Sequence, residues 1–106
     1  MITEQDVEEA LDYLRDSAQE YSQWRALERY YEHKLKRIES IEFVNVDKGA
    51  VEFKRMVARA SENYGQCLED YKDAKYNSEL LSAKRMGAQL TISYYQTYTR
   101  AKVGGY

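Results

Sequence analysis

The feature that most constrains the fold is an absence: over 106 residues there is no proline, and the five glycines are scattered. Proline and glycine are the residues that most often interrupt helices. Apolar residues also recur at alternating steps of four and three, which is the pattern of a helix with one apolar seam. We therefore predict an all-α, coiled-coil-like protein.

The first helix is predicted to span about residues 3–42. Thr3 can cap its start, and Asp6, three residues later, completes a variant of the capping box. The predicted seam begins with Val7, Leu11, Leu14, Ala18 and Tyr21. A three-residue stammer is predicted after Tyr21, because the seam then continues through Trp24, Leu27, Tyr31, Leu35 and Ile38.

The middle of the chain is predicted to hold a tight connection and a short helix. A β-branched and aromatic patch around Phe43 breaks the helical period, and Asp47 can cap a second helix of about residues 47–60. Ser61 can then cap the next segment. We favour a break at this point over the competing interpretation, a single helix with a kink.

The last helix, about residues 62–102, carries two apolar stripes. The first contains Tyr76, Leu80, Ala83, Gly87, Leu90, Tyr94 and Ala101. The second lies about a quarter turn round the helix and contains Tyr71, Ala74, Leu81, Ala88, Ile92 and Tyr95. One partner helix cannot cover both, so either the short helix or another copy of the chain covers the second stripe. We predict another copy, with a self-association surface of Tyr71, Leu81, Ala88, Ile92 and Tyr95.

Together these elements predict one helical domain over residues 1–106, a long antiparallel hairpin with a short middle helix, completed by homo-oligomerisation. Residues 1–20 sum to a charge of -6 and residues 80–106 to +4, so antiparallel packing sets opposite charges together. The composition, 43% hydrophobic, is too apolar for a disordered chain. A single cysteine and no leader or membrane-span pattern predict a cytoplasmic protein without a membrane partner.

No motif in the sequence carries recognisable catalytic or metal chemistry. There is no phosphate-binding glycine loop, zinc-protease pattern or paired-cysteine motif. His33 is the only histidine and Cys67 the only cysteine, so a Cys-His pair would need those two side chains to meet. We predict a protein that is not an enzyme and that uses no cofactor or metal.

An acidic ladder runs along the first helix at steps of four residues: Glu8, Asp12, Asp16 and Glu20. Like charges four residues apart destabilise a helix slightly. One interpretation is a surface for a basic partner, or a mimic of phosphate spacing that captures a nucleic-acid-binding enzyme. The other is a solvated acidic face without a partner.

Two basic sets follow the acidic ladder along the chain. The first is on the same helix, at Arg25, Arg29 and Arg37, with His33 between them. The second is a basic and aromatic segment near the end of the chain, with Lys84, Arg85, Tyr95, Tyr98, Arg100 and Lys102. Cations beside aromatic rings suit a single-stranded nucleic acid. The acidic pI, near 5.5, and pairing between the helices argue against this interpretation.

Residues 47–102 resemble small helical proteins carried by bacteriophages. The resemblance depends on Asp47-Lys48-Gly49, the stretch from Ala58 to Tyr64, Lys84-Arg85, Tyr94-Tyr95 and Arg100. It implies a protein of a mobile element, in the host cytoplasm, that acts in DNA metabolism or inhibits a host enzyme. It assigns no functional residues.

The leading prediction is a non-enzymatic, self-associating helical adaptor that contacts DNA or DNA-processing machinery. An inhibitor of a host protein, acting through the acidic ladder as a nucleic-acid mimic, is the first alternative. A structural coiled-coil component of a particle is the second.

Overall fold

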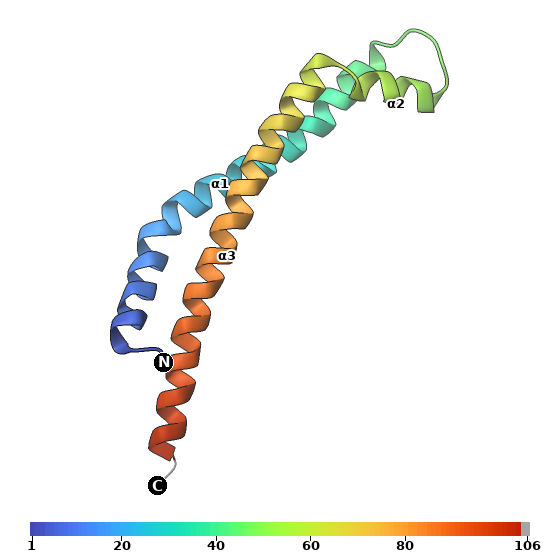
Figure 1. Ribbon diagram of the computed structural model, residues 1–106. Coiled ribbons are helices and arrows are strands. Elements are labelled where there is room, and N and C mark those ends of the chain that lie inside the picture. The colour runs from blue at the N-terminus through green and yellow to red at the C-terminus, as the bar shows by residue number, and fades with distance from the viewer. Residues whose placement is uncertain (105–106) are drawn as a thin grey trace. The chain divides into compact units, whose positions relative to one another are not determined.

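The computed structural model describes residues 1–104, which form three helices (Figure 1). Helix α1 spans Glu4–Val44, α2 spans Val51–Arg59 and α3 spans Glu62–Gly104. No strand occurs in this part of the chain. The prediction of an all-α fold with two long helices and a short middle helix is confirmed. Within residues 1–104, no helix combines the length and apolar character that crossing a membrane requires.

The start of α1 is held by the predicted capping box. The backbone N–H of Thr3 donates to Asp6 Oδ2 at 2.8 Å, and the backbone N–H of Asp6 donates to Thr3 Oγ1 at 3.2 Å. The backbone N–H of Thr3, and to a smaller extent its side chain, hold the pKa of the Asp6 carboxyl below its usual value. Sequence chemistry alone therefore located this end correctly.

The connection between α1 and α2 differs from the prediction. Helix α1 continues through Phe43 to Val44, because a β-branched residue costs a helix only a few tenths of a kcal/mol. The prediction that Asp47 caps α2 is wrong: Ala50 occupies the N-cap and no side chain caps the helix. Gly49 makes the turn with a φ of +126°, and a Cβ there would lie 2.6 Å from Phe53 Cδ1.

The predicted break between the second and third helices is confirmed. Helix α2 ends at Arg59 and α3 begins at Glu62. The backbone N–H of Tyr64 donates to Ser61 Oγ at 3.2 Å, so Ser61 caps α3 as its sequence position indicated.

The chain forms two compact units, and both long helices contribute to each. Unit 1 consists of Met1–Ser22 and the chain from Glu79 onward, and unit 2 consists of Gln23–Ser78. In unit 1 the Tyr95 hydroxyl donates to Glu4 Oε1, whereas Arg85 reaches the Leu14 carbonyl. In unit 2, Asn63 donates to Glu42 and Cys67 lies against the Tyr31 carbonyl. The helices are therefore antiparallel within each unit.

The buried positions hold mostly small side chains. Ala10 and Ser17 are buried in unit 1; the buried residues of unit 2 are Leu35, Ala58, Cys67, Ala74 and Ser78. No large side chain in the described chain is fully buried. Small residues at a contact allow two helix axes to approach closely, so the units are held by close backbone packing and by many half-buried rings.

The inward-facing positions of α1 correct the predicted seam. Leu11 is 51% exposed, whereas its neighbour Ala10 is 8% exposed. The buried and half-buried positions alternate by three and four: Val7, Ala10, Leu14, Ser17 and Tyr21 in unit 1, then Trp24, Glu28, Tyr31, Leu35 and Ile38 in unit 2. The rhythm has no interruption, so the predicted stammer is wrong. The sequence indicated a stammer because Leu11, Ala18 and Leu27 are more apolar or larger than the neighbours that actually face inward, Ala10, Ser17 and Glu28.

The two stripes of α3 also differ from the prediction. The packed face, which is buried or half-buried, consists of Tyr71, Ala74, Ser78, Leu81, Arg85, Ala88, Ile92 and Tyr95. The outward stripe is exposed and consists of Tyr76, Leu80, Ala83, Gly87, Leu90 and Tyr94. The residues assigned to self-association, Tyr71, Leu81, Ala88, Ile92 and Tyr95, thus pack within the chain, which corrects that assignment.

Candidate functional site

The acidic ladder of unit 1 lies on the solvent side of α1, with Glu8, Asp12, Asp16 and Glu20 all exposed. Arg15 lies between two of these carboxylates: its Nη2 is 3.4 Å from Asp12 Oδ1 and its Nε is 3.0 Å from Asp16 Oδ1. Such exposed pairs contribute little energy. The ladder is a continuous acidic surface whose middle is partly neutralised by one arginine.

Arg85 is not part of an exposed basic surface. Its Nη1 donates to the Leu14 carbonyl at 2.7 Å and to Ser17 Oγ at 2.8 Å, and its guanidinium lies 5.2 Å from the centre of the Tyr21 ring. A guanidinium bound in this way joins α3 to α1. The structure thus places Arg85 on the packed face of α3 and not on the exposed basic surface that the sequence predicted.

The other predicted residues near the end of α3 do not form one surface. Tyr95 lies on the packed face, and its hydroxyl donates to Glu4 Oε1 at 3.4 Å. Tyr98 and Lys102 line a hollow of about 320 Å³ with the first residues of the chain. Lys84 and Arg100 are exposed, but the helical period places them on nearly opposite sides of α3. These residues are close in the sequence, but the turn of the helix places them on different sides of α3.

The basic face of α1 is a coherent surface in unit 2. Its members are all exposed: Arg25, Arg29, His33, Lys36 and Arg37. They share the side of the helix opposite its inward-facing positions. Arg29 and Arg37 form no ion pair within residues 1–104. The structure thus brings the three predicted arginines of α1 together, with Lys36, which the sequence also placed beside them.

Two carboxylates of α1 near the basic face are bound to other helices. Glu39 Oε1 is 3.7 Å from Arg55 Nε and 3.4 Å from Arg59 Nε, both in α2. Glu42 accepts a hydrogen bond from Asn63 of α3. Glu32 is exposed among the basic residues, so the outward side of α1 carries one carboxylate against four Arg and Lys side chains and keeps a net positive charge.

Tyr30 is a member of this surface that the sequence interpretation missed. Its ring is 56% exposed, and Lys34 Nζ lies 5.9 Å from the ring centre. A hollow of about 120 Å³ beside it is lined by Tyr30, His33, Lys34 and Arg37. These four residues are spaced at i, i+3, i+4 and i+7, so the helical period alone could have associated the tyrosine with the basic residues.

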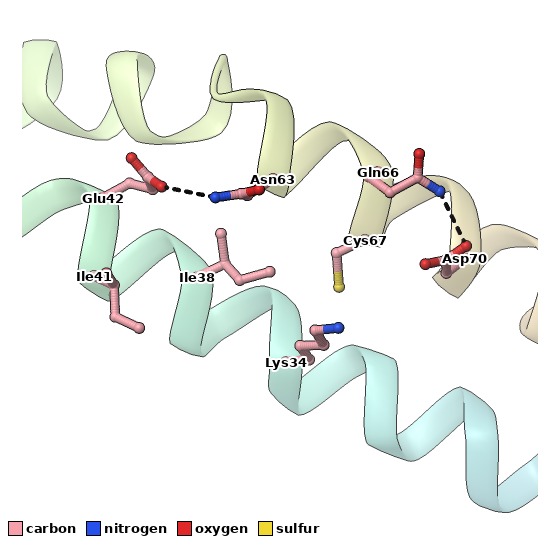
Figure 2. Close-up of a pocket in the computed structure, with 8 residues that line it drawn as sticks. All are labelled: Lys34, Ile38, Ile41, Glu42, Asn63, Gln66, Cys67 and Asp70. Carbon is pink, nitrogen blue, oxygen red and sulfur yellow. Dashed lines mark hydrogen bonds between the residues drawn. The ribbon is translucent and has the colours of Figure 1, made fainter.

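A groove of about 310 Å³ lies between α1 and α3 in unit 2 (Figure 2). Its walls are Lys34, Ile38, Ile41 and Glu42 from α1 and Asn63, Gln66, Cys67 and Asp70 from α3. Figure 2 shows the Cys67 side chain pointing toward α1, and the hydrogen bond from Asn63 Nδ2 to Glu42 Oε1, 3.5 Å long, at one end. The hydrogen bond from Gln66 to Asp70 stays within α3. The polar side chains of this groove thus mainly form hydrogen bonds with one another.

The Cys67 thiol in this groove is a packing group. Its Sγ lies 3.8 Å from the Tyr31 carbonyl oxygen and its side chain is almost fully buried. Burial raises the pKa of the Cys67 thiol; the charge of Lys34 lowers it and that of Asp70 raises it, both less than burial does. A protonated, buried thiol is a poor nucleophile. Among residues 1–104, no group of three or more His, Cys, Asp or Glu side chains converges on a position for a metal ion.

Comparison of the chain with known proteins gives no assignment: no protein-family model, curated protein or solved structure matches it.

Proposed function

We propose that this chain is a non-enzymatic, self-associating helical adaptor that contacts single-stranded nucleic acid, in keeping with a role beside DNA-processing machinery. The observation that carries the proposal is the exposed Tyr30 ring among basic side chains on the basic face of α1. Phosphates are attracted by the cations, and an unpaired base can stack on the ring. Residues in α1 of unit 2, and not the end of α3, are the proposed contact.

The electrostatics of unit 2 support this choice. Arg29 and Arg37 form no ion pair in the described chain, so binding a phosphate does not require breaking one. Glu39 and Glu42 are held by contacts to α2 and α3. The net charge of the chain is -2, so binding depends on this local face and should be sensitive to salt.

The test is fluorescence anisotropy with labelled single-stranded and duplex DNA at several salt concentrations. The double variant Arg29→Glu with Arg37→Glu should weaken single-strand binding, and the slope of log affinity against log salt should fall by about two when two phosphate contacts are lost. Tyr30→Ala should weaken single-strand binding more than duplex binding, because only an unpaired base can stack on the ring.

A matched control is Lys48→Glu with Lys72→Glu, which changes the net charge equally at exposed positions of the same unit. This control should keep most of the affinity. No binding by the unmodified chain at micromolar concentration, or equal losses in the two double variants, contradicts the proposal.

The acidic ladder supports one rival function, capture of a basic protein. Its supporting observation is that all four carboxylates are exposed on one side of α1. Reversing the charge of Asp12 and Asp16 should abolish capture of such a partner in a pull-down, and unchanged capture rejects this function.

A further inference from the structure

The outward stripe of α3 is more apolar than the face that packs within the chain. Tyr76, Leu80, Leu90 and Tyr94 are 65%, 39%, 63% and 62% exposed. Between Leu80 and Thr99 only two residues of α3 are charged, Lys84 and Arg85, and Arg85 is bound to α1. A continuous apolar stripe at heptad spacing, with no helix of its own chain against it, is the pattern of a coiled-coil seam.

The stripe is symmetric about the level of Arg85. Ala83 and Gly87 lie two residues on either side of it, Leu80 and Leu90 five residues, and Tyr76 and Tyr94 nine residues. When such a helix packs antiparallel on a copy of itself, tyrosine meets tyrosine, leucine meets leucine, and alanine meets glycine. A twofold interface requires this self-complementarity.

The centre of the stripe is shaped for close approach. Apart from its own turn of α3, nothing lies within 4 Å of the position that a Cβ on Gly87 would occupy. The neighbouring position four residues earlier is Ala83, so neither side chain holds a second helix away at this level. The flanking leucines can then pack on each side of the crossing, as anchors of the interface.

Charge selects the orientation of the second copy. Residues 62–79 contain five carboxylates and two lysines, whereas residues 80–104 contain four basic residues and no carboxylate. Parallel packing would set like charges side by side. Antiparallel packing sets the acidic half of one α3 along the basic half of the other, and it points the two helix dipoles in opposite directions, which is the favourable arrangement.

We infer that α3 pairs with α3 of a second copy of this chain, antiparallel, through the outward stripe and about a twofold axis at the level of Arg85. This inference deepens the self-association part of the proposed function. It also moves the interface from the packed face of α3 to the opposite side of the helix.

The first test is the molar mass of the full chain by analytical ultracentrifugation across micromolar to submillimolar concentration. The unmodified chain should approach the dimer mass. Leu80→Glu with Leu90→Glu should stay monomeric, with affinity lowered at least about a hundredfold because two anchors become charges. Gln89→Glu with Gln96→Glu adds the same charge at exposed positions off the stripe and should still dimerise. A monomer at all concentrations, or equal effects of both pairs, overturns the inference.

The second test determines orientation by disulfide formation in the Cys67→Ala background. In the antiparallel dimer the two copies of residue 80 are about 15 Å apart along the axis, beyond disulfide reach. Leu80→Cys alone and Leu90→Cys alone should therefore not cross-link, whereas a mixture of the two variants should. Cross-linking of each variant alone, with none between them, shows a parallel dimer and overturns the antiparallel arrangement.

The two proposals fail separately. The Leu80→Glu and Leu90→Glu double variant leaves the basic face of α1 unchanged, so its anisotropy with single-stranded DNA measures nucleic-acid contact in a monomer. A dimer that does not bind DNA contradicts only the proposed nucleic-acid contact. A monomer that binds DNA contradicts self-association and the α3 pairing, but leaves the nucleic-acid contact standing.

Discussion

Both faces of α3 are mainly apolar, but the polar side chains lie on the packed face and not on the outward stripe. The packed face includes Ser78, which is buried, and Arg85, whose guanidinium bonds to α1. The outward stripe, by contrast, presents two leucines and two tyrosines to solvent. In a monomeric hairpin the hydrophobic effect should place the more apolar face inside. The packed face thus accepts polar side chains where hydrogen bonds to α1 satisfy them, whereas the exposed apolar stripe is the surface that we propose to meet a second copy.

The largest expected difference between the faces comes from placing the same charge on each. Ala74 on the packed face is 1% exposed, so Ala74→Asp buries a carboxylate without a partner and should cost about 3–5 kcal/mol of unfolding free energy. Ala83→Asp on the outward stripe should cost only about 0.7 kcal/mol, from helix propensity. Urea unfolding followed by circular dichroism measures both.

The same two variants should also differ in whether they form the proposed dimer. Ala83→Asp should remain helical yet lose the dimer in the ultracentrifuge, because the new carboxylate lies at the centre of the α3 crossing. If Ala74→Asp is as stable as Ala83→Asp, the assignment of the two faces is wrong.

A smaller effect is expected where the packed face is polar. Arg85→Ala removes two hydrogen bonds and a cation-π contact between α3 and α1, and should cost about 1–3 kcal/mol. Its neighbour Lys84 is exposed, so Lys84→Ala removes the same charge and should change stability by less than about 0.5 kcal/mol. Thermal unfolding of both variants checks this, and equal midpoints would show that the contacts of the half-buried Arg85 do not contribute to stability.

The helices and most of their ends could be predicted from the sequence, because capping depends on local chemistry. Thr3 with Asp6, and Ser61 before Tyr64, act where their positions indicated. The inward faces could not be predicted in the same way. A search for large apolar residues prefers Leu11 to Ala10, although the helical period turns Ala10 inward and leaves Leu11 exposed.

The candidate site was predicted only in part for a related reason. Arg25, Arg29 and Arg37 lie on one face of one helix, so the helical period was sufficient to group them. Arg85 resembles any surface arginine in the sequence, and only its contacts to Leu14 and Ser17 across the hairpin show that it is a packing residue. Contacts between residues distant in sequence carry information that a periodic pattern does not contain.

The smallest expected effect concerns thiol reactivity on the two faces. Cys67, on the α1-facing side of α3, should react with iodoacetamide at least about tenfold more slowly than a cysteine on the outward stripe, made by Ala83→Cys in the Cys67→Ala background. Burial raises the pKa of the Cys67 thiol, so less thiolate is present near neutral pH, and the reagent must also wait for local opening.

Protein concentration should affect only the cysteine on the outward stripe. Its alkylation should slow as the dimer forms and covers Ala83, whereas the rate at Cys67 should stay constant, since burial within unit 2 does not depend on a second copy. Mass spectrometry of quenched samples gives both rates. A concentration-independent rate at position 83 is incompatible with pairing of α3 through its outward stripe, even where the unfolding measurements agree with the assignment of the two faces.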